Sequence, residues 1–305
     1  MFKVSVIIPV YNRAKLIKEA VESALNFEQV GEVLIVDDGS TDGSLEICKE
    51  ISQQEKRVKI FRHPNGNNKG VSASRNLGIK NARFEYISFL DSDDFYHKNR
   101  FELDEKVFEE NPEASVVYSL SQIQFENGNT ESFGTNKNLL REVNNNRNEF
   151  YRYVLEKEIM LGHISSVTFK KTVFYKIPKW FDTRLSLHED TEFWNRVARK
   201  YPFYSGQLSI SVSTYTHHTG NTISKRSKDS EIKLLVVFID NVGIHHLWDF
   251  EKNYIIYHLA RAISNPIRPH WIRKTILHGV QIVLIPVKNV FTRYFYHWGM
   301  RHLKL

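Results

Sequence analysis

The stretch YISFLDSDDFY, Tyr86–Tyr96, sets an apolar strand directly against a cluster of acids. Its apolar residues 87–90 end abruptly at Asp91-Ser92-Asp93-Asp94. Carboxylates this close repel one another, and the end of a buried strand tolerates them only if water or a cation neutralises them. Oxygen ligands suit Mg²⁺ or Mn²⁺ better than they suit a thiolate-bound zinc. The stretch therefore predicts a divalent-metal site, with Asp94, beyond the Asp-Ser-Asp motif, capping the helix that follows.

The composition is that of an ordinary globular protein. The chain has 305 residues, 41% hydrophobic and 25% charged, enough for one large core or two smaller ones. Its single cysteine, Cys48, excludes a disulfide framework and a cysteine-cluster metal site, and fits a reducing cytoplasm. The start, MFKVSVIIPVYNR, lacks a cleavage-site pattern and predicts a strand rather than a signal peptide. We find no apolar run of the ~18 residues that a membrane-spanning helix needs.

Positive charge is concentrated at the end of the chain. Residues 1–260 contain 34 Lys or Arg and 35 Asp or Glu, whereas residues 261–305 contain eight basic residues and no acid. Because the body is neutral, this distribution argues against nucleic acid as a partner. A basic tail favours contact with an anionic membrane surface.

Apolar runs alternate with helical spacings through the first part of the chain. Strands are expected at 3–10, 33–36, 58–62, 87–90 and 115–118, separated by helices at 13–27, 42–54, 69–81 and 97–110. Continuous apolar strands are typical of sheets covered on both faces. The alternation predicts an α/β fold with a right-handed, mostly parallel sheet.

Polar residues follow three of these strands directly: Tyr11-Asn12, Asp37-Asp38 and Asp91-Ser92-Asp93. Ligands of such sheets bind at the carboxyl ends of the strands, so these motifs are expected to converge on one edge. The convergence predicts a nucleotide site. The chain has neither a G-x-G-x-x-G after the first strand nor a G-x-x-x-x-G-K-[ST], which argues against a dinucleotide cofactor and a P-loop enzyme.

The second part of the chain has a different pattern. It predicts a hairpin at 122–131 about Asn127-Gly128, an Asn-rich surface loop at 135–148, helices at 150–157 and 189–199, and strands at 163–169, 203–205 and 208–217. Helices are expected from about Asp229, at 229–247, 251–264 and 268–303, with a break at Pro286.

Each polar residue near the expected nucleotide site has a structural alternative. Asp93 is expected to bind the metal, whereas Asp91 reaches either the metal shell or a ribose hydroxyl; a polar turn is the alternative for both. Asp37 and Asp38 can accept hydrogen bonds from uracil or ribose, or belong to an N-cap turn. Tyr11 offers a ring face to a base or packs in the core.

Basic and acidic residues elsewhere complete the expected site. Arg75 pairs with the base or the diphosphate, or lies on a solvated helix face. His188-Glu189-Asp190 supplies a general base at a helix start, or simply caps that helix. Trp194 forms an apolar wall for a sugar or packs in the core. His218, preferred over His217, completes the metal shell or contacts phosphate; the alternative is a strand-end pair without a role.

Together these segments resemble the inverting, nucleotide-sugar-dependent glycosyltransferases of family 2. The matching segments are VSVIIPVYNR at 4–13, VLIVDDGSTDGS at 33–44, NKGVSASRNLGI at 68–79, YISFLDSDD at 86–94 and HEDTEFWNRV at 188–197. Each segment is weak alone, but five in this order are specific. They cover roughly residues 3–225.

The resemblance implies a GT-A fold, which is Rossmann-like with a mostly parallel central sheet flanked by helices. It implies a catalytic domain at 1–225, with a nucleotide-binding half at 1–118 and an acceptor-binding half at 119–225, and a helical extension at 226–305. The nucleotide-sugar is then bound by Pro9, Tyr11, Asp37, Asp38, Arg75, Asp91, Ser92, Asp93 and Glu189. The metal, Mn²⁺ or Mg²⁺, is held by Asp91, Asp93 and His218, and Asp190 is the catalytic base.

The implied activity moves one sugar from a nucleotide-sugar, most simply a UDP-sugar, to a hydroxyl of a saccharide or lipid-linked saccharide in bacterial-type surface polysaccharide synthesis. The Gln-(Arg/Lys)-Arg-Arg-Trp signature of processive synthases is absent, so one sugar is expected per encounter. The alternatives are a sugar nucleotidyltransferase, which needs a Gly- and Arg-rich first loop, or a non-catalytic nucleotide-sugar-binding protein. No sequence pattern identifies the donor sugar, the acceptor, the linkage or the oligomeric state.

The basic tail, residues 266–305, is also rich in aromatic residues, a composition typical of interfacial helices. We expect a cytoplasmic protein with this tail on the inner face of the cell membrane. The alternative is a helix packed on the catalytic domain or in a dimer.

Overall fold

The computed structural model describes residues 1–133, 147–156, 162–218, 227–264 and 288–303. The expected loop at 135–148 and the first part of the last expected helix, to residue 287, lie largely outside these ranges. The strands are β1 (Val4–Val10), β2 (Val30–Asp37), β3 (Val58–Arg62), β4 (Tyr86–Phe89), β5 (Phe95–Tyr96), β6 (Val116–Tyr118), β7 (Ser121–Gln124), β8 (Thr130–Phe133), β9 (Val167–Lys170), β10 (Phe203–Ser205) and β11 (Ser213–Thr216). The α-helices are α1 (Ile17–Leu25), α2 (Ser44–Gln54), α3 (Val71–Asn81), α4 (Glu102–Glu110), α6 (Arg147–Glu156), α7 (Thr172–Lys176), α8 (Glu189–Ala198), α9 (Lys228–Val242), α10 (Asp249–Ser264) and α12 (Lys288–His302).

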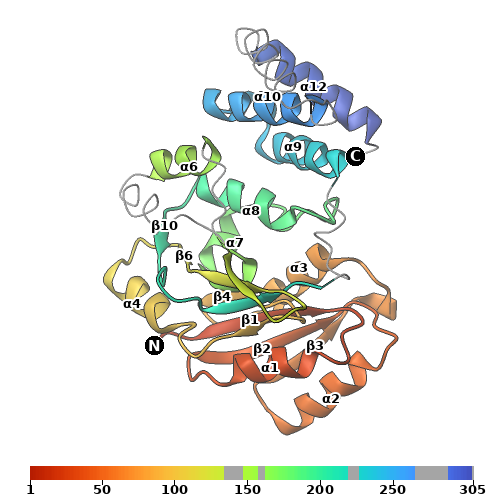
Figure 1. The fold of residues 1–305 in the computed structure, drawn as a ribbon, viewed down its shortest axis with the longest axis vertical. Coiled ribbons are helices and arrows are strands. Elements are labelled where there is room, and N and C mark those ends of the chain that lie inside the picture. The colour runs from red at the N-terminus through yellow and green to blue at the C-terminus, as the bar shows by residue number, and fades with distance from the viewer. Residues whose placement is uncertain (134–146, 157–161, 219–226, 265–287, 304–305) are drawn as a thin grey trace.

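The main sheet has seven strands in the order β10-β6-β9-β4-β1-β2-β3 (Figure 1). All neighbouring pairs are parallel except those of β9, which runs antiparallel to both β4 and β6. Alternate residues of β1 face opposite sides: Val6 and Ile8 pack in one apolar cluster with α1, and Ile7 packs in the other. Gly78 lets α3 approach the sheet, because a Cβ there would lie 2.4 Å from Ile7. The predicted α/β class and mostly parallel sheet are confirmed.

A second sheet, in the order β5-β11-β7-β8, carries the expected hairpin about Asn127-Gly128. Gly128 has a φ of +83°, which glycine adopts without strain. Strands β7 and β11 are parallel, with Gln124 opposite Thr216, so both end at the same edge. The backbone N–H of Thr216 donates to the carboxylate of Asp94, 3.0 Å away, which joins this edge to the residues that follow β4.

The chain ends in a helical layer made by α9, α10 and α12, at the opposite end of the molecule from β1, β2 and β3 (Figure 1). These helices share a third apolar cluster that includes Val236, Ile255 and Phe295. A helical C-terminal region is therefore confirmed. Much of the apolar surface of α12 packs against α9 and α10. Among the described residues, no helix is both long and apolar enough to cross a bilayer. The division of the chain at residues 118 and 225 stays a prediction.

Two local predictions after β4 are wrong. The helix expected at 97–110 begins at Glu102, because Phe95 and Tyr96 form β5 and pair with β11. Asp94 does not cap that helix: its side chain is buried and accepts hydrogen bonds from Thr216 and Ser165.

Candidate active site

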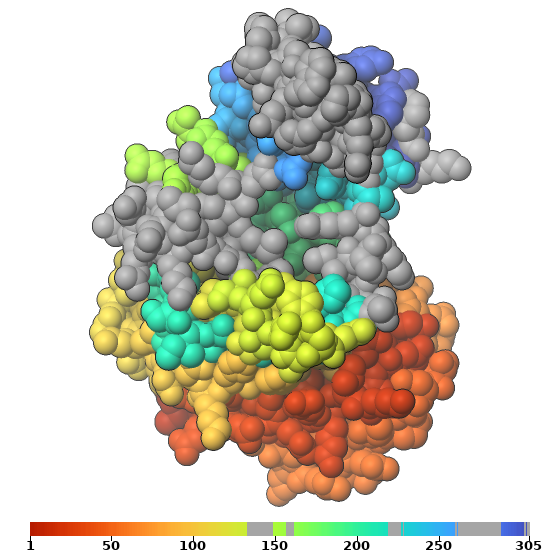
Figure 2. Space-filling model, in the orientation of Figure 1, coloured from red at the N-terminus to blue at the C-terminus, as the bar shows by residue number. Residues whose placement is uncertain are grey.

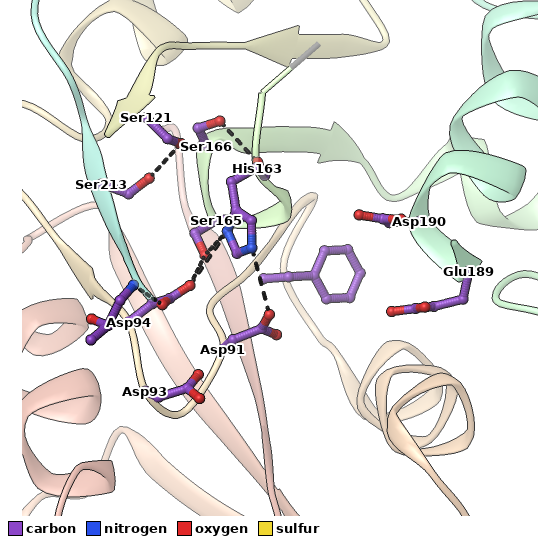
Figure 3. Close-up of polar contacts among 12 residues, drawn as sticks. Asp91, Asp93, Asp94, Ser121, His163, Ser165, Ser166, Glu189, Asp190 and Ser213 are labelled. Atoms are coloured by element: carbon purple, nitrogen blue, oxygen red, sulfur yellow. Dashed lines mark hydrogen bonds and ion pairs between the residues drawn. The ribbon is translucent and has the colours of Figure 1, made fainter. Parts of the chain in front are cut away.

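The three carboxylates after β4 point in different directions, and Asp91 and Asp94 both lie beside His163 (Figure 3). Asp91 lies toward Arg75, Asp93 toward Arg13, and Asp94 toward His163. Each acid therefore has a cationic or imidazole neighbour. This arrangement explains how a buried strand can end in clustered acids.

Arg75 joins two parts of the chain that are far apart in sequence. It is 3% exposed, and its guanidinium donates to Asp91 at 2.8 Å and to Glu189 at 2.7 Å. Burial opposes its charge, but Asp91 and Glu189 raise the pKa of Arg75 above its ordinary value. Burial raises the pKa of Asp91, but the charges of Arg75, His163 and Arg13 and the hydrogen bond from Arg75 together lower it below its ordinary value. Arg75 is therefore neither solvated nor turned away, but bridges the Asp-Ser-Asp motif and the start of α8.

Asp93 is held from the opposite side. Nε of Arg13 donates to its Oδ2 at 3.1 Å, and Nε2 of His218 lies 3.0 Å from the same oxygen. The structure thus brings together Asp93 and His218, two of the three expected metal ligands. Asp91 belongs to the same stretch but turns toward Arg75 and His163.

A buried histidine that the sequence did not single out lies between the other two acids. Nε2 of His163 is 3.9 Å from Asp91, and Nδ1 is 3.4 Å from Asp94. Burial lowers the pKa of His163 although the charge of Asp91 raises it, and burial together with the charges of Asp91 and Asp93 raises the pKa of Asp94. Ligand atoms of Asp91, Asp94 and His163 lie within 4.8 Å of one another.

These side chains fit a hard divalent cation. Carboxylate oxygens suit Mn²⁺ or Mg²⁺, and the single cysteine, Cys48, is buried within α2. The donor set is broader than the sequence predicted, because Asp94 and His163 are as close to Asp91 as a shared ion requires.

The expected nucleoside residues lie at the ends of β1 and β2. Asp37 is fully buried and accepts from Nε of Arg62 at 2.9 Å and from the N–H of Ser40 at 3.2 Å. Asp38 accepts from the backbone N–H groups of Lys69 and Gly70, at 2.7 and 2.9 Å. Both acids thus fix loops at this edge of the sheet.

The remaining expected residues differ in exposure. Tyr11 is 47% exposed, in agreement with a ring face offered to a ligand rather than core packing. Pro9 lies in β1 opposite Val36, and Ser92 is buried. Trp194 is 6% exposed within an apolar cluster, so core packing describes it better than a sugar-facing wall.

Asp190 lies at the start of α8, one residue after the glutamate that Arg75 holds. Its Oδ1 accepts from the backbone N–H of Thr191 at 2.6 Å. His188, the preceding N-cap, has a φ of 63°, which is unusual for a side chain with a Cβ. The fold thus brings Asp190 to the same region as Asp91 (Figure 3), while its role as general base stays a prediction.

Sequence reasoning missed three residues of this site. Arg62 ends β3 opposite Asp37, so the rule that ligands gather at the carboxyl ends of strands could have found it. Arg13 follows the Tyr11-Asn12 pair and could have been found in the same way. His163 offers no such signal, because it lies in an irregular turn before β9 and far from Asp91 in sequence.

The profile of the family described as Glycosyl transferase family 2 matches residues 5–178, more than half of the chain. The chain belongs to glycosyltransferase family 2. The matched part of this family 2 chain contains the Asp-Ser-Asp motif and His163, whereas Asp190 and His218 lie beyond it.

Two of the related sequences belong to proteins longer than this chain. An uncharacterized glycosyltransferase of Rickettsia felis is 50% identical over 114 residues, which are 36% of this chain and 18% of that protein. The chondroitin synthase of Pasteurella multocida is 38% identical over 120 residues, 39% of this chain and 12% of the synthase. The alignments thus span less than a fifth of either relative.

Solved structures resemble the chain over almost all of its length. Residues 1–349 of Staphylococcus aureus TarS, in complex with UDP-GlcNAc, match with a TM-score of 0.64 at 18% identity, over 99% of this chain and 90% of that one. The mannosyltransferase PcManGT of Pyrobaculum calidifontis, in complex with GDP-Man and Mn²⁺, matches with a TM-score of 0.53 at 15% identity, over 98% and 74%. The expected GT-A fold is confirmed.

Proposed function

We propose that this family 2 chain transfers one sugar from a UDP-sugar to a hydroxyl of a saccharide or lipid-linked saccharide, with inversion and with Mn²⁺ or Mg²⁺. The observation that carries the proposal is the bridge through Arg75, which ties the Asp-Ser-Asp motif to the segment that ends in Asp190. Such a bridge places a donor-side acid and a candidate base on one rigid support.

The donor side consists of the residues after β1, β2 and β4. Tyr11 offers a ring face to the base, and Asp37 and Asp38 offer carboxylate lone pairs to an imide N–H or ribose hydroxyl. The proposed ligands Asp91, Asp93 and His218 would hold the cation, and Asp94 and His163 are close enough to Asp91 to share it. When bound, the cation stabilises the negative charge that the departing diphosphate gains.

The acceptor side begins at α8. In this proposal Asp190 takes the proton from the acceptor hydroxyl, whose oxygen attacks the anomeric carbon opposite to the leaving UDP. A single displacement of this kind inverts the anomeric centre. Arg75 keeps Glu189 in place beside the base, and Pro9 and Ser92 shape the donor side by their backbone.

UDP is preferred as the carrier because TarS, a structural neighbour, was solved with UDP-GlcNAc. A role in surface polysaccharide synthesis draws support from the chondroitin and hyaluronan synthases of Pasteurella multocida among the relatives. A cytoplasmic location on the inner face of the membrane, through the basic tail, belongs to the same proposal. The alternatives are a sugar nucleotidyltransferase and a non-catalytic nucleotide-sugar-binding protein.

A donor screen tests the proposal. Thermal unfolding is followed with Mn²⁺ and UDP-, GDP-, CDP- or dTDP-sugars, since a ligand stabilises the native state by RT ln(1 + [L]/Kd). UDP-sugars are expected to raise Tm most, and only with the metal. A rise with GDP-sugars alone would overturn the choice of UDP. Binding without any hydrolysis or transfer would favour the non-catalytic alternative.

Asp190→Asn tests the base. Asparagine has the same size as aspartate but cannot accept a proton. UDP binding should therefore stay near normal while the rate of transfer falls about 10²–10⁴-fold. Activity is measured as UDP released with acceptor present. Asp229→Asn is the matched control, because it makes the same change at an exposed acid in the first turn of another helix, α9. Transfer by Asp190→Asn above about a tenth of the wild-type rate would show that the base is elsewhere.

A further inference from the structure

A series of four rings runs along the second sheet, away from the acids. His163 stacks on Tyr215 with ring centroids 4.8 Å apart, Tyr215 is 6.5 Å from His217, and His217 is 5.5 Å from Phe125. The inner end of the series is 3.9 Å from the carboxylate of Asp91. The outer end reaches the hairpin β7–β8, which stands on the face of the molecule seen in Figure 2.

A pocket lies at the outer end of this series. Phe125, Glu126, Asn127 and His217 line an open space of about 290 Å³. Small-molecule sites start at roughly 300 Å³, so this open space lies at the lower end of their range and has room for one sugar unit. The next residue along the chain, His218, lies 3.0 Å from Asp93, so the pocket adjoins the proposed donor site.

The backbone fixes the pocket from both strands. The N–H of His217 donates to the carbonyl oxygen of Gln124 at 2.8 Å, which continues the pairing of β11 with β7. Phe125 donates to Asn129 at 2.9 Å and accepts from Gly128 at 2.8 Å, which closes the hairpin. Phe125 and His217 therefore sit on paired backbone, which preforms this part of the pocket, and Glu126 and Asn127 belong to the turn of the hairpin.

The lining chemistry matches a saccharide. Aromatic faces carry a negative quadrupole that attracts the weakly positive C–H face of a pyranose, and a carboxylate and an amide bind its hydroxyls. The acid at Glu126 disfavours a phosphate in the pocket. Asp37 and Asp38, the candidate nucleoside contacts, follow β2 in the main sheet, whereas the pocket belongs to the second sheet.

We propose that the pocket is a subsite for the acceptor saccharide, which rests on the proposed glycosyl transfer. A sugar unit of the acceptor stacks on Phe125 and His217 and hydrogen-bonds to Glu126 and Asn127. Figure 3 shows Asp190 on the far side of His163 from the strand that carries Ser213. The unit in the pocket is thus further along the acceptor than the unit whose hydroxyl reacts, and the subsite selects acceptors of more than one sugar.

Binding of soluble tetrasaccharides tests the subsite on the full chain. Maltotetraose, cellotetraose and chitotetraose are each offered at about 10 mM, which detects millimolar affinity, and binding is followed by saturation-transfer NMR. Phe125→Ala is expected to weaken binding of the preferred tetrasaccharide about 5- to 10-fold, the effect of losing one aromatic contact. UDP binding with Mn²⁺ should change less than about twofold. Tyr294→Ala, 66% exposed on α12, is the matched control and should change neither.

Glu126→Ala is the second variant, because it lies exposed on the hairpin and leaves the ring series intact. It should weaken tetrasaccharide binding while leaving UDP binding unchanged. The subsite is overturned if wild-type protein binds none of the tetrasaccharides, if both variants bind them as wild type does, or if UDP binding falls in parallel. Absence of UDP binding by wild-type protein is a separate result, which would instead refute the proposed function.

Discussion

Among the single side chains, Arg75 is the one that links the Asp-Ser-Asp motif to the start of α8. Its guanidinium is buried against Asp91 and Glu189 and lies 5.4 Å above the ring of Phe181. Arg75→Met should lower the free energy of unfolding by about 3–5 kcal/mol, because it leaves two buried carboxylates without their cation. Urea unfolding at pH 7 measures the loss. The free energy of unfolding of Arg75→Lys should lie between those of wild type and Arg75→Met, since an ammonium group cannot reach both acids.

An Arg75→Met variant as stable as wild type would mean that water or another cation already balances the two acids. The acid partners of Arg75 were not predictable from the sequence. Helical spacing could place Arg75 on α3, but it could not tell that this face of α3 lies between β4 and the start of α8. Only the fold brings Glu189, 114 residues later, within 2.7 Å.

Glu32 is expected to contribute to the stability of the fold and not to ligand binding. It is buried at the end of the sheet away from the acids, where it accepts from Ser5, from the backbone of Arg83 and from the guanidinium of Arg83. Burial raises its pKa, but these hydrogen bonds and the charge of Arg83 lower it. Glu32→Gln should therefore reduce stability by about 1–3 kcal/mol and leave UDP binding unchanged, as urea unfolding and thermal shift with UDP would measure. Weakened UDP binding in a folded Glu32→Gln variant would contradict this separation.

At the scale of the element, an ionic network ties α9 to the segment before α8. Arg184 pairs with Asp182 at 2.7 Å and with Asp240 at 2.9 Å, and Asn241 donates to Asp182. Tyr296 of α12 donates to Asp240 at 2.7 Å. The helical layer thus holds the chain that leads into His188 and Asp190.

This network predicts a pH-dependent stability. Burial raises the pKa of Asp182 and Asp240, but hydrogen bonds and the charge of Arg184 lower both below their ordinary values. A lowered folded-state pKa means that the stabilisation is present above the unfolded pKa and is lost as pH falls through the folded pKa. Asp240→Asn should cost about 1–3 kcal/mol at pH 7 and progressively less as the pH falls below about 4.

Unfolding free energies from pH 3 to 7 would measure this narrowing gap between wild type and Asp240→Asn. Glu22→Gln is the control, because its pair with Lys18 is exposed and should contribute less than about 1 kcal/mol at any pH. A constant gap across the pH range would show that Asp240 acts through packing rather than through charge.

The sequence predicts best the strands that consist mainly of consecutive apolar residues. Strands β1, β2 and β4 are buried on both faces, and their mainly apolar sequences reveal them despite Ser5, Glu32 and Ser88. Strand β5 has only Phe95 and Tyr96, too short for any period, and its pairing with β11 depends on a partner more than a hundred residues later. That pairing displaced the start of α4 and turned Asp94 inward.

At the scale of the whole molecule, the charge asymmetry of the sequence can be tested. In α12, Tyr294 is exposed, and so are Arg293 and Arg301, while Phe295 packs inward. The double variant Arg293→Glu and Arg301→Glu should reduce flotation with anionic vesicles, because each basic residue near such a surface contributes about 1 kcal/mol. Added salt should weaken wild-type flotation in the same way.

Lys15→Glu with Lys49→Glu is the matched control for that experiment, since both lysines are exposed and lie far from α12 in the fold. Flotation that is indifferent to the α12 charges would exclude these residues as the membrane contact. Charge reversal is preferable to truncation before α12, because loss of Phe295 would open the apolar cluster of α9 and α10.

The antiparallel strand β9 has a consequence for how the molecule is made. It fills the place between β4 and β6, yet it is synthesised about fifty residues after β6. At roughly 5–20 residues per second, the ribosome leaves the edge of β4 unpaired for several seconds. An unpaired apolar edge is a template for association with another chain. Nascent chains stalled between β6 and β9 should therefore be the ones that chaperones hold.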